Sequence, residues 1–252
     1  MLKFFLIFLL FLIPATTSAY SLVTKTVDGH RVRVFVIPHN DAYRVTAVAS
    51  NTGSSLKNLI LSGSGIAWIN GAYFIPQDYT KLADTTNTVR IMNSDGLLYS
   101  RYYPDTGING IFGFDSDHIP ILVQNNIYGD ASLRENYNSG LLLTLQSGIA
   151  NFPILLASGN NIVPRYDTNW LITAKMKLVG TKSFICRTRE NDIKMGTITK
   201  ISMLDVPWLI TRFGCVDAIN LDNGGSLAMY DRSRYITGPG RNIMDAFIIV
   251  KK

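Results

Sequence analysis

The feature that most restricts the fold of this chain is its succession of short apolar runs separated by turn-forming residues. Several of these runs alternate, as Val32, Val34 and Val36 do with the residues between them. Alternation with a period of two is typical of a half-buried β-strand. Only two segments have the longer period of a helix. The sequence therefore predicts a single-domain α+β fold, in which strand-rich mixed or antiparallel sheets pack with a few helices.

The predicted strands are separated by turn signals along most of the chain. They cover residues 31–38, 43–49, 89–92, 110–114, 119–123, 175–179, 183–187, 194–201 and 246–250. Turn-forming residues, Pro-His-Asn-Asp at 38–41, lie between the first two of these strands. We therefore expect those two strands to form a hairpin.

Two segments resemble one another and end in the same polar residues. In the first, Ser54 and Ser55 can cap a helix that Gly63 ends, and a short apolar strand leads to Asn70. In the second, Ser202 can cap a helix that Gly214 ends, and residues 216–219 lead to Asn220. If the two strands are neighbours, their ends face one pocket, and glycine lets a ligand approach the backbone closely. The alternative is two tight Asn-Gly turns.

The N-terminus has the pattern of a signal peptide. Lys3 precedes ten unbroken apolar residues, 4–13, and small residues at 17–19 offer a cleavage site. Such a run is too short to span a bilayer comfortably. We expect residues 1–19 to be removed and residues 20–252 to be exported without stable membrane insertion; an uncleaved anchor is the alternative. The chain lacks an Asn-x-Ser/Thr acceptor, which favours a periplasmic or secreted bacterial protein.

Charge and cysteine content narrow the partners further. The formal net charge is +6, but the basic residues are scattered, so we expect no nucleic-acid partner and leave an anionic substrate open. Cys186 and Cys215 are the only cysteines and form either a disulfide or two buried thiols. The three histidines lack metal-ligand spacing, and we expect no cofactor.

Three motifs in order then resemble a known family. They are Asn-Gly-Ala-Tyr-Phe at 70–74, Cys-Arg-Thr at 186–188 and Asn-Leu-Asp-Asn-Gly-Gly-Ser at 220–226, followed by Gly-Arg-Asn at 240–242. From about residue 50 to its C-terminus the chain resembles the phosphodiester glycosidase family. The resemblance implies cleavage between the anomeric carbon of a sugar and a phosphodiester, with a sugar-phosphate or polysaccharide substrate.

The chemistry of such a substrate suggests how few groups the site needs. A phosphate monoester is a good leaving group, so one carboxylate and one or two arginines could suffice where most glycosidases use two carboxylates. The resemblance places Asp222, Arg187, Arg241, Asn70 and Asn220 in the site. From the chemistry we expect Asp222 to act as nucleophile or base and Arg187 or Arg241 to hold the phosphate. We expect Asn70 and Asn220 to bind sugar hydroxyls or to orient Asp222. The remaining substrate-binding candidates are Gly71, Tyr73, Thr188, Gly224, Gly225 and Ser226. The N–H groups of the last three could cradle phosphate.

Several positions depart from the family pattern. Asn223 stands where the family usually has glycine, and we expect its tolerance of a left-handed backbone to preserve the turn. Arg189 and Glu190 replace small or apolar residues and could reshape the phosphate end. Asp217 and Asp231 leave a hard cation such as calcium open beside Asp222. The alternative function is a non-catalytic envelope protein that binds a sugar-phosphate polymer or exopolysaccharide.

Overall fold

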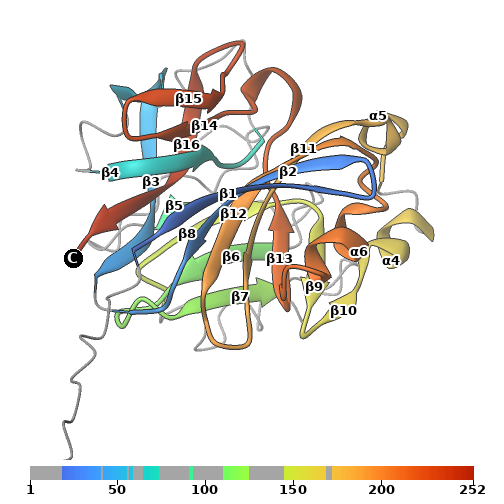
Figure 1. The fold of residues 1–252 in the computed structure, drawn as a ribbon, viewed down its shortest axis with the longest axis horizontal. Coiled ribbons are helices and arrows are strands. Elements are labelled where there is room, and N and C mark those ends of the chain that lie inside the picture. The colour runs from blue at the N-terminus through green and yellow to red at the C-terminus, as the bar shows by residue number, and fades with distance from the viewer. Residues whose placement is uncertain are drawn as a thin grey trace, which may run out of the picture.

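The described part of the chain folds into three β-sheets with a few short helices, which form one compact body (Figure 1). The computed structural model describes residues 19–40, 42–55, 57–58, 65–73, 91–92, 110–124, 145–168 and 172–252. Residues 1–18 of the predicted signal peptide lie outside this set. Each of the strand pairs in the described residues is antiparallel. The predicted strand-rich fold with few helices is confirmed.

The largest sheet has seven strands in the order β1-β2-β12-β11-β13-β9-β10. Their bounds are β1 Ser21–Val27, β2 His30–Ile37, β9 Ile154–Ala157, β10 Asn160–Asn161, β11 Gly180–Arg187, β12 Ile193–Ile201 and β13 Asp217–Asn220. Asp28 and Gly29 join β1 to β2 with φ values of 48° and 82°. Two positive φ values suit a tight hairpin turn, because the turn then matches the twist of the strands.

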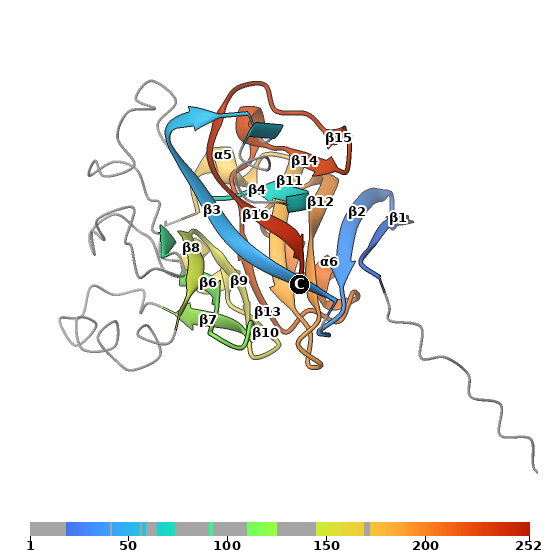
Figure 2. The same cartoon turned by 90° about the vertical axis from the view of Figure 1, so that its left-hand side faces the viewer.

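A second sheet has the order β15-β14-β4-β16-β3 and a third has the order β5-β8-β6-β7. The second contains β3 Tyr43–Ser54, β4 Gly65–Asn70, β14 Met229–Asp231, β15 Arg234–Thr237 and β16 Ile243–Lys251; the third contains β5 Ile91–Met92, β6 Gly110–Phe114, β7 Pro120–Gln124 and β8 Ser147–Asn151. The long strands β3 and β16 run side by side across the molecule (Figure 2). Phe247 of β16 packs against Phe112 and Phe114 of β6, with ring centroids 6.2 Å apart in both pairs. These rings join the two sheets in one core.

Two secondary-structure predictions are wrong. The strands predicted at 31–38 and 43–49 exist, but they lie in different sheets: β2 pairs with β1 and β12, whereas β3 pairs with β16. The turn at Asp28 and Gly29 makes the real hairpin, because two residues there reverse the chain. The strand predicted at 175–179 is instead helix α5, Ala174–Lys177, followed by Leu178 and Val179 with 66% and 70% exposure. Alternation without a buried face carries no strand signal.

The other helices are short and follow the expected signals only in part. They are α4 Val163–Thr168, α6 Val206–Thr211 and the 3₁₀ turn η2 Gly224–Ser226. Helix α6 begins after Asp205 rather than Ser202, with Pro207 in its first turn, where proline is well tolerated. As predicted, Gly214 follows its end, with φ +77°. Of the helix expected near 56–60, only Lys57 and Asn58 are described, and they are helical.

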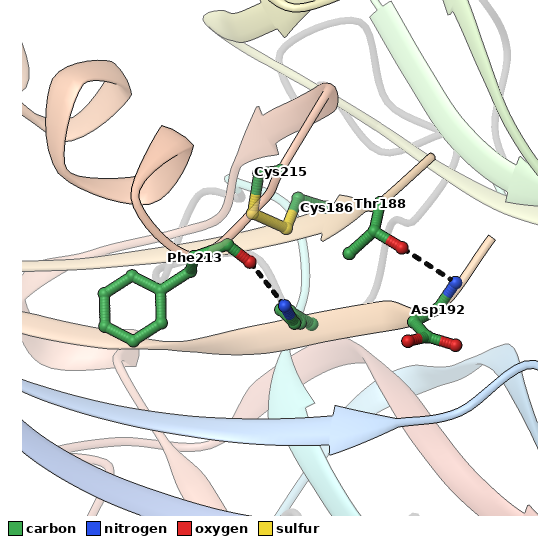
Figure 3. Close-up of a disulfide and its surroundings, with 6 residues drawn as sticks. Cys186, Thr188, Asp192, Phe213 and Cys215 are labelled. Atoms are coloured by element: carbon green, nitrogen blue, oxygen red, sulfur yellow. Dashed lines mark hydrogen bonds between the residues drawn. A yellow bond between two sulfur atoms is a disulfide. The ribbon is translucent and has the colours of Figure 1, made fainter. Parts of the chain in front are cut away.

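Cys186 and Cys215 form a disulfide, which decides between the two alternatives for these residues (Figure 3). The bond connects β11 to the segment just before β13, and both cysteines are buried. A disulfide fits an extracellular location, since thiols remain reduced in the cytosol. Among the described helices, none combines the length and apolar character needed to cross a membrane.

Candidate active site

The ends of β4 and β13 meet, although the two strands belong to different sheets. The condition set from the sequence, that the two strands be neighbours in a sheet, is therefore not met. The Asn70 side chain donates to the Asp222 carbonyl oxygen at 2.7 Å, and its own oxygen accepts from the Ala228 N–H at 2.9 Å. The Asp222 N–H donates to the Gly71 carbonyl at 2.7 Å. The buried amide of Asn70 therefore holds both arms of the glycine-rich loop, and it orients the backbone of Asp222.

A third strand end completes the arrangement. Asn151, the last residue of β8, is fully buried and donates from its side chain to the Asn220 carbonyl at 2.8 Å. The Tyr73 N–H donates to the Asn151 side-chain oxygen at 3.4 Å. Sequence reasoning missed Asn151, although Ile-Ala-Asn at 149–151 repeats the apolar-to-Asn pattern of the other two strands. Each sheet thus contributes to this junction a strand that ends in asparagine.

The side chains of Asn220, Asn223 and Tyr73 form one network. Asn220 donates to the Tyr73 hydroxyl at 2.7 Å and to the Phe152 carbonyl at 2.9 Å, and it accepts from the Asn223 amide at 3.0 Å. The Asn223 side-chain oxygen accepts from the Ser183 N–H at 2.8 Å. These hydrogen bonds fix the glycine-rich loop to β11 and to the segments around Tyr73 and Phe152.

The expectation for the Asn223 backbone is wrong. Its φ of −120° is extended, and Gly224 takes the positive φ of +67° instead. An extended Asn223 points its amide toward Ser183 and Asn220, and these contacts explain how its side chain fits in the loop.

Asp222 is a buried carboxyl group with polar partners on one side. Its side chain is 5% exposed, and Oδ1 accepts from the Asn223 N–H at 2.7 Å. Ser226 also hydrogen-bonds to it, and the Ser226 hydroxyl accepts from Arg241 Nε at 2.8 Å. Burial raises the Asp222 pKa to about 6, although the Ser226 and Asn223 hydrogen bonds and the charges of Arg241 and Lys175 act to lower it. The group can therefore gain or lose a proton near neutral pH.

Arg241 and the glycine turn form the outer side of this group. Gly224 and Gly225 are exposed, and the Arg241 guanidinium lies so close to Gly225 that a Cβ there would be 3.5 Å from Cζ. The Gly240 N–H donates to the Gly225 carbonyl at 2.8 Å, which ties the Arg241 segment to the turn. A positive charge and an exposed, side-chain-free turn thus lie beside one buried carboxyl group.

Arg187 and Thr188 lie away from this group, contrary to the predicted site. In the β11–β13 register, Arg187 is opposite Asp217, whereas Phe184 is opposite Asn220. Arg187 forms an ion pair with Asp217 at 2.5 Å and donates to Asn191 at 3.1 Å. The antiparallel pairing places it at the start of β13, at the opposite end from Asp222.

Thr188 belongs to the turn after β11. Its hydroxyl accepts from the Asp192 N–H at 3.2 Å (Figure 3). Arg189 and Glu190 are exposed in the same turn, and they lie with Thr188 away from Asp222.

A second buried carboxyl group, Asp245, lies near Asp222, and the sequence motifs did not reveal it. It is 2% exposed on β16, its Oδ1 accepts from the Ala72 N–H at 2.6 Å, and its carbonyl accepts from the Gly71 N–H at 3.0 Å. The one signal in the sequence is an isolated aspartate inside an otherwise apolar strand, Ile-Met-Asp-Ala-Phe. The described residues contain no group of three or more His, Cys, Asp or Glu side chains that could hold a metal ion.

The sequence model of the family described as phosphodiester glycosidase matches residues 64–250, a range that includes Asn70, Asp222 and Arg241. The chain belongs to the phosphodiester glycosidase family. No curated protein matches it.

Solved structures of low sequence identity share the fold. The catalytic domain of zebrafish N-acetylglucosamine-1-phosphodiester alpha-N-acetylglucosaminidase, auto-inhibited by its pro-peptide, matches with a TM-score of 0.65 and 15% identity over 93% of this chain and 83% of that one. A Synechocystis hypothetical protein matches with a TM-score of 0.59 and 12% identity over 92% and 62%. A candidate exported protein of Burkholderia pseudomallei K96243 matches with a TM-score of 0.52 and 9% identity over 88% and 74%.

Proposed function

We propose that the protein is an exported glycosidase that hydrolyses the bond between the anomeric carbon of a sugar and a phosphodiester. The substrate resembles an N-acetylglucosamine-1-phosphodiester or a sugar phosphate of the cell envelope. The observation that carries this proposal is the buried carboxyl group of Asp222, connected through the Ser226 hydroxyl to Arg241. Family membership supports the reaction class.

The proposed reaction breaks the bond from the anomeric carbon to the phosphate oxygen, and that oxygen leaves with the bonding electrons as a phosphate monoester. Arg241 would neutralise the developing charge, so that no acid need protonate the leaving group. Asp222 would then act in one of two ways. As base it takes a proton from the attacking water; as nucleophile it forms a glycosyl ester that water later hydrolyses. In both cases the products are the free sugar and a phosphate monoester.

Asn70 and Asn220 enter this proposal as positioning residues. Their amide groups are occupied by the Asp222 carbonyl, the Ala228 N–H, Tyr73, Phe152 and Asn223. They would therefore orient Asp222 and the loop rather than bind sugar hydroxyls. The exposed turn at Gly224 and Gly225, beside Arg241, would receive the phosphate.

The test is turnover of a sugar-1-phosphodiester or a UDP-sugar, followed by assay of the free reducing sugar. Asp222→Asn should lower kcat by roughly 10²–10⁴-fold, since it removes the base or nucleophile but little volume. Glu190→Gln, in the exposed turn after β11, is the matched carboxylate control and should leave turnover unchanged. Near-full turnover by Asp222→Asn would refute the role of Asp222. Binding without sugar release by the wild type would favour the envelope-binding alternative.

Export can be tested separately from the chemistry. We propose that residues 1–19 are cleaved and that the mature protein begins at Tyr20, whose side chain is buried and whose hydroxyl donates to Asp231 at 2.9 Å. The full chain, produced in a bacterium with a periplasm, should be recovered outside the cytoplasm with Tyr20 as its first residue. Recovery in the cytoplasm with Met1 intact would contradict export.

A further inference from the structure

The carboxyl group of Asp245 is a buried group that the proposed chemistry does not use. Its Oδ1 has one partner, the Ala72 N–H, and its Oδ2 has no hydrogen-bond partner among the described residues. Gly71 leaves the space for it, because a Cβ at that position would lie 1.9 Å from Oδ1. The Asp245 carboxyl group is therefore packed closely against the backbone of Gly71, just after the end of β4.

No positive charge in the described residues pairs with this group. Gly71 and Ala72, from the end of β4, bind Asp245 with their N–H groups, and Ala49 of β3 lies opposite it in register; none of the three is charged. Of the charged groups that the structure describes, the one that acts on Asp245 is the carboxylate of Asp222. An isolated buried charge is strongly unfavourable, and a second negative charge nearby adds to the cost.

We propose that Asp245 is held as a neutral carboxylic acid behind Gly71 and is a positioning residue for Asp222, so that the site carries one negative charge and not two. The catalytic consequence rests on the proposed function; the protonation state does not. Asp222 ionises first because it has the Asn223 N–H, Ser226 and Arg241 beside it, whereas Asp245 has one N–H.

The pKa values of the two groups agree with this order of ionisation. Burial raises the pKa of Asp245 to about 8, and the Asp222 charge raises it further, while the Ala72 N–H lowers it. The pKa of Asp222 is about 6. Between these values Asp222 is charged and Asp245 is neutral. Above about pH 8, ionised Asp245 would place a second negative charge beside the site and would repel an anionic substrate.

The first test is the melting temperature of the wild type and of Asp245→Asn between pH 4 and pH 9. A raised folded-state pKa means that, between the ordinary value of 3.8 and about 8, the folded protein holds a proton that the unfolded chain has lost. Wild-type stability therefore falls as pH rises through this window, and the asparagine, which is always neutral, escapes the loss. The variant's melting temperature should gain on the wild type by roughly 2–5 °C per pH unit.

A matched control is Asp217→Asn, which removes another buried carboxyl group, one paired with Arg187. It should lower the melting temperature at pH 7.5, because it leaves a cation without its partner. A difference between Asp245→Asn and the wild type that does not change with pH would overturn the proposal. So would a lower melting temperature of Asp245→Asn at pH 8.

Wild-type protein labelled with ¹³C at the aspartate carboxyl carbons gives a measurement that needs neither a variant nor turnover. One carboxyl resonance should titrate above pH 7, and a second near 6. If every aspartate is ionised at pH 7, the proposal fails, whatever substrate the protein hydrolyses.

The pH dependence of kcat/KM then tests whether Asp245 is a positioning residue for Asp222. In the wild type, kcat/KM should fall above about pH 8, and in Asp245→Asn the ratio of kcat/KM at pH 9 to that at pH 7 should be closer to one. Asp245→Ala should lower kcat/KM at every pH, because the Ala72 N–H loses its acceptor. Identical pH profiles for the wild type and Asp245→Asn would overturn the role. An inactive wild type that still shows the high-pH resonance would refute the proposed function and leave the neutral Asp245 standing.

Discussion

At Asp222, burial and hydrogen bonding act on one carboxyl group in opposite directions. Burial favours the neutral acid, whereas the Asn223 N–H, the Ser226 hydroxyl and the charge of Arg241 favour the anion. The balance gives a pKa of about 6, above the ordinary value of 3.8. A group poised in this range can serve as base or nucleophile at neutral pH and still exchange protons readily.

The acid side of the pH profile should follow Asp222. Because the proposed reaction needs the Asp222 anion, kcat/KM should rise as pH increases through about 6 and level off above it. Steady-state kinetics of the wild type between pH 4.5 and 7.5 measure this midpoint. A profile that is flat down to pH 5 would show that Asp222 does not titrate in the catalytic step.

Arg241→Ala should both weaken binding of the substrate phosphate and raise the pKa of Asp222. Loss of a charged hydrogen-bond partner should reduce kcat/KM by about 10- to 100-fold. The acid midpoint should also move up, since the Arg241 charge lowers the Asp222 pKa. Arg187→Ala is the informative comparison, because Arg187 pairs with Asp217 at the other end of β13. A larger loss of kcat/KM in Arg187→Ala than in Arg241→Ala would contradict the proposed binding of the phosphate beside Arg241.

Among the elements, β4, β8 and β13 each end in an asparagine at the candidate site. β4, β8 and β13 come from three different sheets, and the side chains of Asn70 and Asn151 donate to the carbonyls of Asp222 and Asn220. Buried backbone groups at a strand end need partners, because an unpaired one is costly. Asparagine supplies both a donor and an acceptor, which suits a junction where no strand continues.

Gly71→Ala should disrupt this junction. The new Cβ would overlap Asp245 Oδ1 and approach the Ile149 side chain, so either the end of β4 or Asp245 must move. We expect a loss of about 1–3 kcal/mol in the free energy of unfolding, measured by guanidinium denaturation. Gly180→Ala, with nothing within 4 Å of its added Cβ, is the control and should change little. Equal effects of the two substitutions would show that the corner at Gly71 is loosely packed.

At the scale of the whole molecule, the disulfide between Cys186 and Cys215 links two segments of the largest sheet covalently. It connects residues 29 positions apart, and both lie in the core. Cys186→Ala combined with Cys215→Ala should cost about 3–4 kcal/mol of unfolding free energy in the chain-entropy account of a loop of this length. Guanidinium denaturation of the double variant and the oxidised wild type measures the difference. A cost below about 1 kcal/mol would mean that native packing alone defines this part of the sheet.

Prediction from the sequence succeeded where neighbouring residues decide the structure. The strands at 110–114, 183–187 and 194–201 carry their pattern locally, and β6, β11 and β12 contain them. It failed where partners are distant. Residues 43–49 form a strand whose partner is the C-terminal β16, and no local pattern distinguishes that partner from β2. The strand predicted at 175–179 failed for a different reason, because burial, and not alternation alone, makes a strand.

Local patterns were enough to predict the strand-rich class, the resemblance to the family and the loop that carries Asp222, since each is carried by short motifs of neighbouring residues. Which residues lie together in the candidate site depends instead on contacts between distant parts of the chain. The antiparallel register moved Arg187 to the far end of β13, and the crossing of β16 beside β4 brought Asp245 behind Gly71. Register and sheet order depend on contacts between residues far apart in the chain, and a motif of seven residues contains none of that information.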